Sequence, residues 1–218
     1  MLIEYIDHYG SDLTVVNAAR VSMGKAHTTI DDSDKKLIEY LARENHFMPF
    51  CHPHITMRFT CPVFIARQLA KHQIGFSWSE ESLRYIAANP VPFYPEKWRK
   101  QAPNVKQGSS DEAVDVDEAE IRNTVDQMFS LYKKLLEQGV CKEQARMLLP
   151  MNTEVTWIWT GSLAAWARLW GLRSDPHAQF EVQLVAKGVA QVLEPIFPLS
   201  WQALVCPRSS EAGMHLEK

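Results

Sequence analysis

The sequence predicts an α+β protein, a single domain over residues 1–218, in which helices outnumber strands. Residues 54–62 (HITMRFTCP) alternate apolar and polar side chains, which is typical of a half-buried strand. Residues 117–138 instead repeat apolar side chains every three to four positions, as one buried face of a helix requires. Because 46% of the 218 residues are hydrophobic, the chain can bury one substantial core.

The first part of the chain divides into short elements with recognisable boundaries. LIEYI (2–6) predicts a strand, and DLTVVNAARVS (12–22) predicts a turn leading into a short helix. DDSDKKLIEYLAREN (31–45) predicts a helix, because its acidic first turn suits the positive end of the helix dipole. Pro62 ends the strand 54–62 and opens a helix, PVFIARQLAKHQ. Four-residue spacing on this helix predicts two polar rows, Arg67 with Lys71 and Gln68 with His72.

The second part begins with a long connection, residues 88–112, whose Pro, Gly and Ser content predicts a functional or flexible loop. After the helix 117–138, CKEQARMLLP predicts a short helix stopped by Pro150. A strand (TEVTWIWTG), a helix ending at Gly171 (SLAAWARLWG) and a long helix from residue 175 then follow. We expect Asp175 to be the N-cap of that last helix and Pro176 its first residue, with His177 in the first turn.

Composition excludes several classes of function. A net charge of −3 argues against broad nucleic-acid binding, although a local group of arginines can still hold one phosphate. The four cysteines are scattered and form no C-x-x-C pair, so we predict neither a zinc site nor a redox dithiol. The N-terminus is acidic where a signal peptide is basic, and no segment has the apolar length of a membrane span. We therefore expect a cytoplasmic protein.

Residues 71–85 (KHQIGFSWSEESLRY) are the densest candidate site, because they mix charged, hydroxyl and aromatic side chains around one glycine. QARMLLP and LRSDPHAQ supply two further basic points. Arg84 with Ser82, Arg146 and Arg173 can converge as charge-assisted donors to one phosphate and one planar base. The alternative is that these arginines form surface ion pairs with the many carboxylates. Spacing alone does not decide between the two.

Three other clusters have less demanding interpretations. Cys51, His52 and His54 are bunched around Pro53 without a distant ligand pair, so a helix-to-strand corner is favoured over a metal site. No base stands near Cys141 or Cys206 to activate a thiol nucleophile. The tryptophan-rich run 157–170 is interpreted as core and interface packing, with a platform for a flavin or base as the alternative.

Three separated motifs in order, ARQLAKHQIGFSWSEESLRY, ARMLLP and LRSDPHAQFEV, strongly resemble the flavin-dependent thymidylate synthases, the ThyX family. The similarity extends from NAARVS through MPFCH to about Phe197. Lys71-His72-Gln73 stands where the family has Arg-His-Arg, Ser79 stands where Asn is usual, and the stretch is one residue longer. These departures resemble a divergent branch found in bacteriophages and some bacteria, which would place a phage-encoded protein in the host cytoplasm.

The resemblance implies a mostly antiparallel sheet with flanking helices and a homotetramer whose active sites combine several subunits. It implies FAD as cofactor, dUMP as substrate, 5,10-methylenetetrahydrofolate and NADPH as co-substrates, and no cysteine nucleophile or metal. Arg173 matches the residue that polarises the uracil. Positions matching dUMP contacts are Gln68, Leu69, Ala70, Lys71, Glu80, Glu81, Ser82, Leu83, Arg84, Arg146 and Arg173. Positions matching FAD contacts are Met48, Lys71, His72, Gln73, Glu80, Ser162, Leu163, Ala164, Arg168 and His177.

The predicted reaction is the reductive methylation of dUMP to dTMP. One alternative keeps the fold and yields a hydroxymethyl product, or acts on a related pyrimidine nucleotide. The other is a non-catalytic nucleotide-binding protein that has lost the chemistry together with the Arg-His-Arg triplet.

Overall fold

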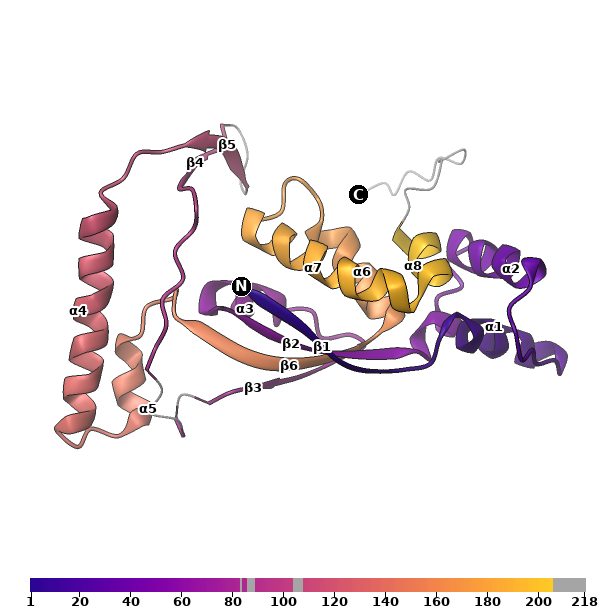
Figure 1. Ribbon diagram of the computed structural model, residues 1–218, viewed down its shortest axis with the longest axis horizontal. Coiled ribbons are helices and arrows are strands. Elements are labelled where there is room, and N and C mark those ends of the chain that lie inside the picture. The colour runs from indigo at the N-terminus through magenta and orange to yellow at the C-terminus, as the bar shows by residue number, and fades with distance from the viewer. Residues whose placement is uncertain (83, 86–88, 104–107, 206–218) are drawn as a thin grey trace, which may run out of the picture.

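A four-stranded antiparallel sheet runs through the middle of the molecule (Figure 1). The structure is a computed structural model, and it describes residues 1–82, 84–85, 89–103 and 108–205. In spatial order its strands are β1 (Leu2–Tyr9), β2 (His54–Pro62), β6 (Glu154–Ser162) and β3 (Phe76–Glu80). Every neighbouring pair is antiparallel. The predicted fold class is therefore confirmed.

Helices lie over one face of this sheet and beyond both of its ends (Figure 1). Over the face lie α6 (Leu163–Arg173), α7 (Phe180–Ile196) and α8 (Pro198–Val205). One end carries α1 (Asp12–Arg20), the 3-10 turns η1 (Val21–Met23) and η2 (Met48–Cys51), and α2 (Asp32–Arg43). Helix α3 (Val63–Leu69) follows β2 directly. None of the helices in the described part of the chain combines the length and apolarity needed to cross a bilayer.

Strand alternation places the core between the sheet and these helices. Ile55, Met57 and Phe59 of β2 are fully buried, as the predicted period of two requires. On the opposite face, hydroxyl side chains pair across β2 and β6: Thr56 with Thr160 at 2.9 Å, and Thr60 with Thr156 at 3.1 Å. The described residues include no helix over that face in Figure 1.

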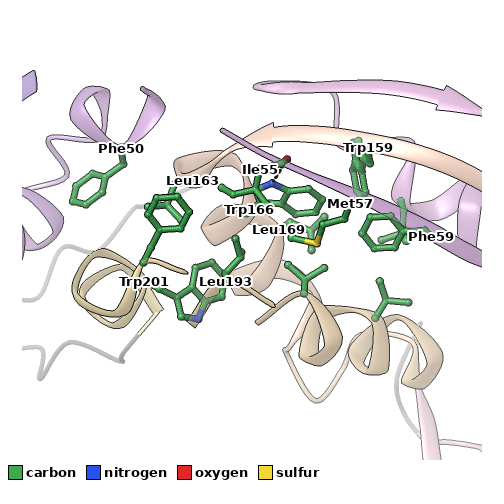
Figure 2. Packing of buried hydrophobic residues seen from close by; sticks show 14 of the residues in the cluster. Phe50, Ile55, Met57, Phe59, Trp159, Leu163, Trp166, Leu169, Leu193 and Trp201 are labelled. Carbon is green, nitrogen blue, oxygen red and sulfur yellow. Dashed lines mark hydrogen bonds between the residues drawn. The ribbon is translucent and has the colours of Figure 1, made fainter. Parts of the chain in front are cut away.

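Tryptophans from β6 and α6 fill the centre of the core. Trp157, Trp159 and Trp166 are at most 1% exposed, and the Phe59 ring lies 5.2 Å from that of Trp157. Figure 2 shows Trp166 between Ile55 and Met57, on the side of the sheet that faces the helices. Core packing, the favoured interpretation of the tryptophan-rich run, is confirmed.

Two glycines bring β3 against this core. Gly75 has φ +78°, and a Cβ there would lie 2.9 Å from that of Ala165, so the turn before β3 requires glycine. A Cβ on Gly161 would overlap the Phe76 ring. Phe76 instead packs edge-on against Trp166, with 4.7 Å between the ring centroids.

The described residues between β3 and β6 form an arm beyond one end of the sheet (Figure 1). Part of the arm returns to α7, where the Arg99 guanidinium lies 4.3 Å from the centre of the Phe180 ring. The arm contains the hairpin of β4 (Arg99–Gln101) and β5 (Ser109–Ala113), then α4 (Glu118–Glu137), α5 (Lys142–Ala145) and the 3-10 turn η3 (Arg146–Leu148). The predicted face of α4 is confirmed at Val125, Phe129 and Tyr132, which are buried. Most of the described part of the predicted long loop is irregular, and a bridge between Pro92 and Thr153 connects its start to the residue before β6.

Three predicted helix boundaries are wrong. Helix α3 ends at Leu69, because His72 N bonds Leu69 O at 2.9 Å in a tight turn, so Lys71 and His72 form no polar rows on it. Helix α6 continues past Gly171 to Arg173. Helix α7 begins only at Phe180, because the Asp175 carboxylate accepts from His177 N at 2.7 Å and closes a separate turn.

A buried carboxylate joins α1 to α2. Asp34 is 0% exposed and accepts from Arg20 Nε and His27 Nδ1, each at 2.8 Å. Burial raises the pKa of Asp34, but the hydrogen bonds from His27 and Arg20 outweigh it, so the pKa lies below its ordinary value. The ionised form therefore adds stability above the unfolded pKa of about 4, and this stability is lost as the pH falls through the folded pKa.

Asp34→Ala is expected to lower the free energy of unfolding by about 3–5 kcal/mol at neutral pH, because it leaves Arg20 without its buried partner. The measurement is urea denaturation followed by circular dichroism. Asp32→Ala is the matched control: Asp32 pairs with Lys35 on the exposed side of the same helix, where solvent screens the pair, so its loss should be much smaller. Equal losses in the two variants would contradict the role assigned to Asp34.

Candidate active site

The end of α6 and the turn after α3 meet at one hydrogen bond. Arg173, the last residue of α6, donates from Nε to Nε2 of His72 at 2.8 Å. His72 is only 9% exposed. Its Nε2 is the acceptor, so in the neutral ring the proton sits on Nδ1.

Electrostatics keep this pair singly charged. Burial, followed by the charges of Arg173 and Arg168, lowers the pKa of His72 to about 4. Burial also lowers the pKa of Arg173, yet a guanidinium stays protonated at neutral pH. Among the described residues, no carboxylate forms an ion pair with Arg173. The site therefore carries a cation whose hydrogen-bond partner is neutral.

A cavity of about 1010 Å³ opens beside this pair. Its lining includes the polar residues Gln68, Lys97, Arg99, Arg173 and His177 and four aromatic residues, Phe64, Phe93, Tyr94 and Trp98. The acidic residues Asp175 and Glu181 also line it. Two atoms of lining residues, Gln68 Oε1 and Trp98 Nε1, are buried and have no hydrogen-bond partner among the described residues.

Some side chains at the predicted flavin positions are exposed to solvent, and others are buried or hydrogen-bonded within the fold. Lys71 and Arg168 are exposed and form no ion pair with any described residue. Met48 is 61% exposed, and His177 is exposed beside the Asp175 carboxylate. Leu163 is fully buried, and Ser162 Oγ caps α6 by accepting from Ala165 N at 3.2 Å. Ser162 and Leu163 can offer a ligand little beyond their main chain.

The predicted phosphate positions lie elsewhere, where β3 approaches α5. Ser82 Oγ accepts from Arg84 Nε at 3.3 Å, and Glu81 Oε1 accepts from Thr156 N at 2.9 Å. Lys142 Nζ donates to Tyr85 O at 2.8 Å, which ties this segment to α5. Arg146 directly follows α5. Leu83 falls outside the described residues.

One chain thus assembles only half of the predicted nucleotide site. Gln68, His72 and Arg173 lie together, whereas Arg84 and Arg146 do not line the cavity that contains Arg173. Figure 1 places α5 in the arm beyond one end of the sheet, whereas α6 lies over one face of the sheet. Convergence of the three arginines within one protomer is not observed. None of the three forms an ion pair with another described residue, so the surface ion-pair alternative is not supported either.

The sequence did not predict the residues of the arm that line the cavity. Phe93, Tyr94 and Trp98 belong to the long connection. Asn152 holds that segment in place, since its Nδ2 donates to Phe93 O at 2.9 Å. The available signal was the concentration of aromatic and basic residues in FYPEKWRK. The predicted corner at residues 51–54 is confirmed, because η2 leads directly to β2.

Comparison with known proteins gives consistent matches over nearly the whole chain. The family model for thymidylate synthase complementing protein matches residues 2–199. Flavin-dependent thymidylate synthase of Thermosipho africanus is 34% identical over 93% of this chain and 90% of the relative. That of Thermus thermophilus is 35% identical over 92% of this chain and 74% of the relative.

Solved structures match equally well. The UMP/dUMP methylase PolB from Streptomyces cacaoi, bound with 5-Br dUMP, superimposes with a TM-score of 0.83 at 28% identity, covering 94% of this chain and 97% of that one. The same methylase bound with 5-Br UMP gives a TM-score of 0.82 at 27% identity, over 94% and 96% of the two chains.

Proposed function

The chain belongs to the thymidylate synthase complementing protein family, and we propose that it methylates dUMP reductively to dTMP. Over 93% of its length it is similar to a flavin-dependent thymidylate synthase. The proposed cofactor is FAD, and the proposed co-substrates are 5,10-methylenetetrahydrofolate and NADPH. The observation that carries the proposal is the Arg173 guanidinium, which is held by His72 at the edge of a cavity and is not ion-paired with any described carboxylate.

This arrangement suits a uracil ring. The Nε–H of Arg173 is engaged by His72, which leaves the N–H groups of Nη1 and Nη2 for a carbonyl oxygen. Gln68 lines the same cavity, and its side-chain amide can contact the polar edge of the ring. A fixed positive charge beside the carbonyl favours loss of the N3 proton, which raises electron density at C5.

The residues also fit a flavin dinucleotide. The exposed side chains of Lys71 and Arg168 have no ion-pair partner among the described residues, so a pyrophosphate can neutralise them. The charge of Arg168 already acts on His72, which places this cation near the same site. When bound, the flavin supplies the reducing equivalents of the reaction. The chain's own contribution is to hold the nucleotide, exclude water and place the Arg173 charge.

A cysteine nucleophile is not favoured by the thiols that the structure describes. Burial raises the pKa of Cys61 to about 12, and burial also raises the pKa of Cys51. Cys141 is exposed at the start of α5 and does not line the cavity of Arg173. These three thiols are free, which fits the proposed cytoplasmic location.

We further propose that the functional unit is an oligomer, a homotetramer by family resemblance. The support is that, within one chain, Arg84 and Arg146 do not line the cavity that contains Arg173. A second copy would bring its Ser82–Arg84 segment to the uracil side of the first and complete a phosphate clamp.

Turnover of the purified protein tests this proposal. The protein should be yellow, and under anaerobic conditions it should convert dUMP to dTMP with methylenetetrahydrofolate and NADPH, as detected by mass spectrometry. A hydroxymethyl product would favour the first alternative, and dUMP binding by a protein that cannot be reconstituted with FAD would favour a non-catalytic role. UMP belongs in the same assay, because the structurally similar methylase was solved with analogues of both nucleotides.

A further inference from the structure

The hydrogen-bond partner of Arg173 is unusual in its chemistry. A partly buried arginine is commonly held by a carboxylate, which forms strong charge-assisted bonds and offsets the positive charge. Here the partner is the Nε2 atom of His72, 2.8 Å from Arg173 Nε, on a segment 101 residues away in sequence. An imidazole can fix the direction of the guanidinium without cancelling its charge, provided that the ring stays neutral.

The surroundings ensure that neutral state. His72 is 9% exposed, and the two charged groups that act on it, Arg173 and Arg168, both belong to α6 and are both positive. Protonation of the ring would add a third positive charge and remove the acceptor. The nearby carboxylate of Asp175 is already engaged by His177, at 2.7 Å from its backbone N and 3.0 Å from its Nδ1.

We propose that His72 is a positioning residue for the reaction: its neutral imidazole orients the Arg173 guanidinium towards the pyrimidine while leaving its full charge to act on the uracil. This inference rests on the proposed function for its chemical meaning. It assigns to the His72 side chain a task different from the flavin contact that the sequence resemblance implies.

Three substitutions separate orientation from charge. His72→Gln places a neutral amide oxygen near the position of Nε2, His72→Glu places a charged oxygen of almost the same shape there, and His72→Leu removes the acceptor. Rates are expressed per bound flavin, with kcat and KM for dUMP measured separately. His54→Gln is the control, because His54 is exposed on β2 and its ring bonds the His52 carbonyl.

We expect the Leu variant to lose roughly 10- to 100-fold in kcat, because a misplaced guanidinium no longer meets the carbonyl. The Gln variant should recover most of this loss. The Glu variant should not, although it accepts the same hydrogen bond, because its charge offsets that of Arg173. The ultraviolet spectrum of bound dUMP should show the N3-ionised form in the wild type and the Gln variant only. Equal kcat in the Gln and Glu variants, or in the Gln and Leu variants, would overturn the proposal.

A measurement without turnover separates this inference from the proposed function. Nitrogen-15 NMR of histidine-labelled protein should show His72 neutral at pH 6, with its proton on Nδ1, and the Arg173→Leu variant should titrate at higher pH. A wild-type His72 that is protonated at pH 6 would refute the positioning role, whatever reaction the protein catalyses. Absence of dTMP formation with a neutral, Nδ1-protonated His72 would instead refute the proposed function alone.

Discussion

Arg173→Ala is expected to lower kcat for dTMP formation by about 10²- to 10³-fold while leaving the flavin bound. The variant removes the guanidinium that lines the cavity beside Gln68 and His72. The proposed flavin cations, Lys71 and Arg168, remain in place. The loss should therefore fall on the ionisation of the uracil rather than on assembly of the holoprotein. Stopped-flow reduction and reoxidation of the flavin, with and without dUMP, measures the two effects separately.

Two further variants complete this experiment. Arg43→Ala removes an arginine on α2, at the far end of the sheet, and should leave kcat unchanged. Arg173→Lys keeps the charge but loses the planar fork that meets both His72 and a carbonyl, so it should recover little activity. Full activity in Arg173→Ala would mean that the uracil is activated by another group.

Mixing two inactive variants is expected to restore activity. Arg84→Ala and Arg173→Ala each remove one half of the proposed nucleotide site, and within one chain Arg84 does not line the cavity that contains Arg173. If each site takes Arg173 from one subunit and Arg84 from another, random hybrids made from equal amounts contain roughly one quarter intact sites. Turnover should rise to about that fraction of the wild-type rate.

The hybrids are made by co-expressing the two variants with different affinity tags and purifying on both tags in succession. Wild type co-expressed with Arg173→Ala serves as the reference for subunit exchange. Hybrids as inactive as the parent variants would show that Arg84 and Arg173 act in the same chain, and the proposed assembly would fail.

Much of the fold follows from local patterns, because burial on one face imposes a period on the sequence. Strand β2 and helix α4 were predicted for this reason, and their buried residues agree. Strand β3 was not predicted, although FSWSE alternates apolar and polar side chains. The alternation covers only five residues, and the charged residues around it hide the pattern. Asp175-Pro176 has the composition of a helix start, but the Asp175 carboxylate closes a turn with His177, and α7 begins only at Phe180.

The site could be predicted only as a set of candidate residues. Motif resemblance indicated His72 and Arg173 separately, but no spacing rule joins two side chains 101 residues apart. The same holds for Arg84, because only the path of the chain shows that it does not line the cavity of Arg173. The aromatic wall around Trp98 was hidden for a similar reason, since the position of its segment depends on the contact between Asn152 and Phe93.

The hydroxyl pairs between β2 and β6 have a consequence for how the protein is made. Thr56 and Thr160 are 104 residues apart, and Thr60 and Thr156 are 96 apart, with the whole arm between them. The central pair of strands therefore cannot form until most of the polypeptide has left the ribosome. High contact order of this kind slows folding and leaves strand edges exposed meanwhile. Nascent chains stalled before residue 154 should consequently depend on chaperones, whereas chains released after α8 should fold unaided.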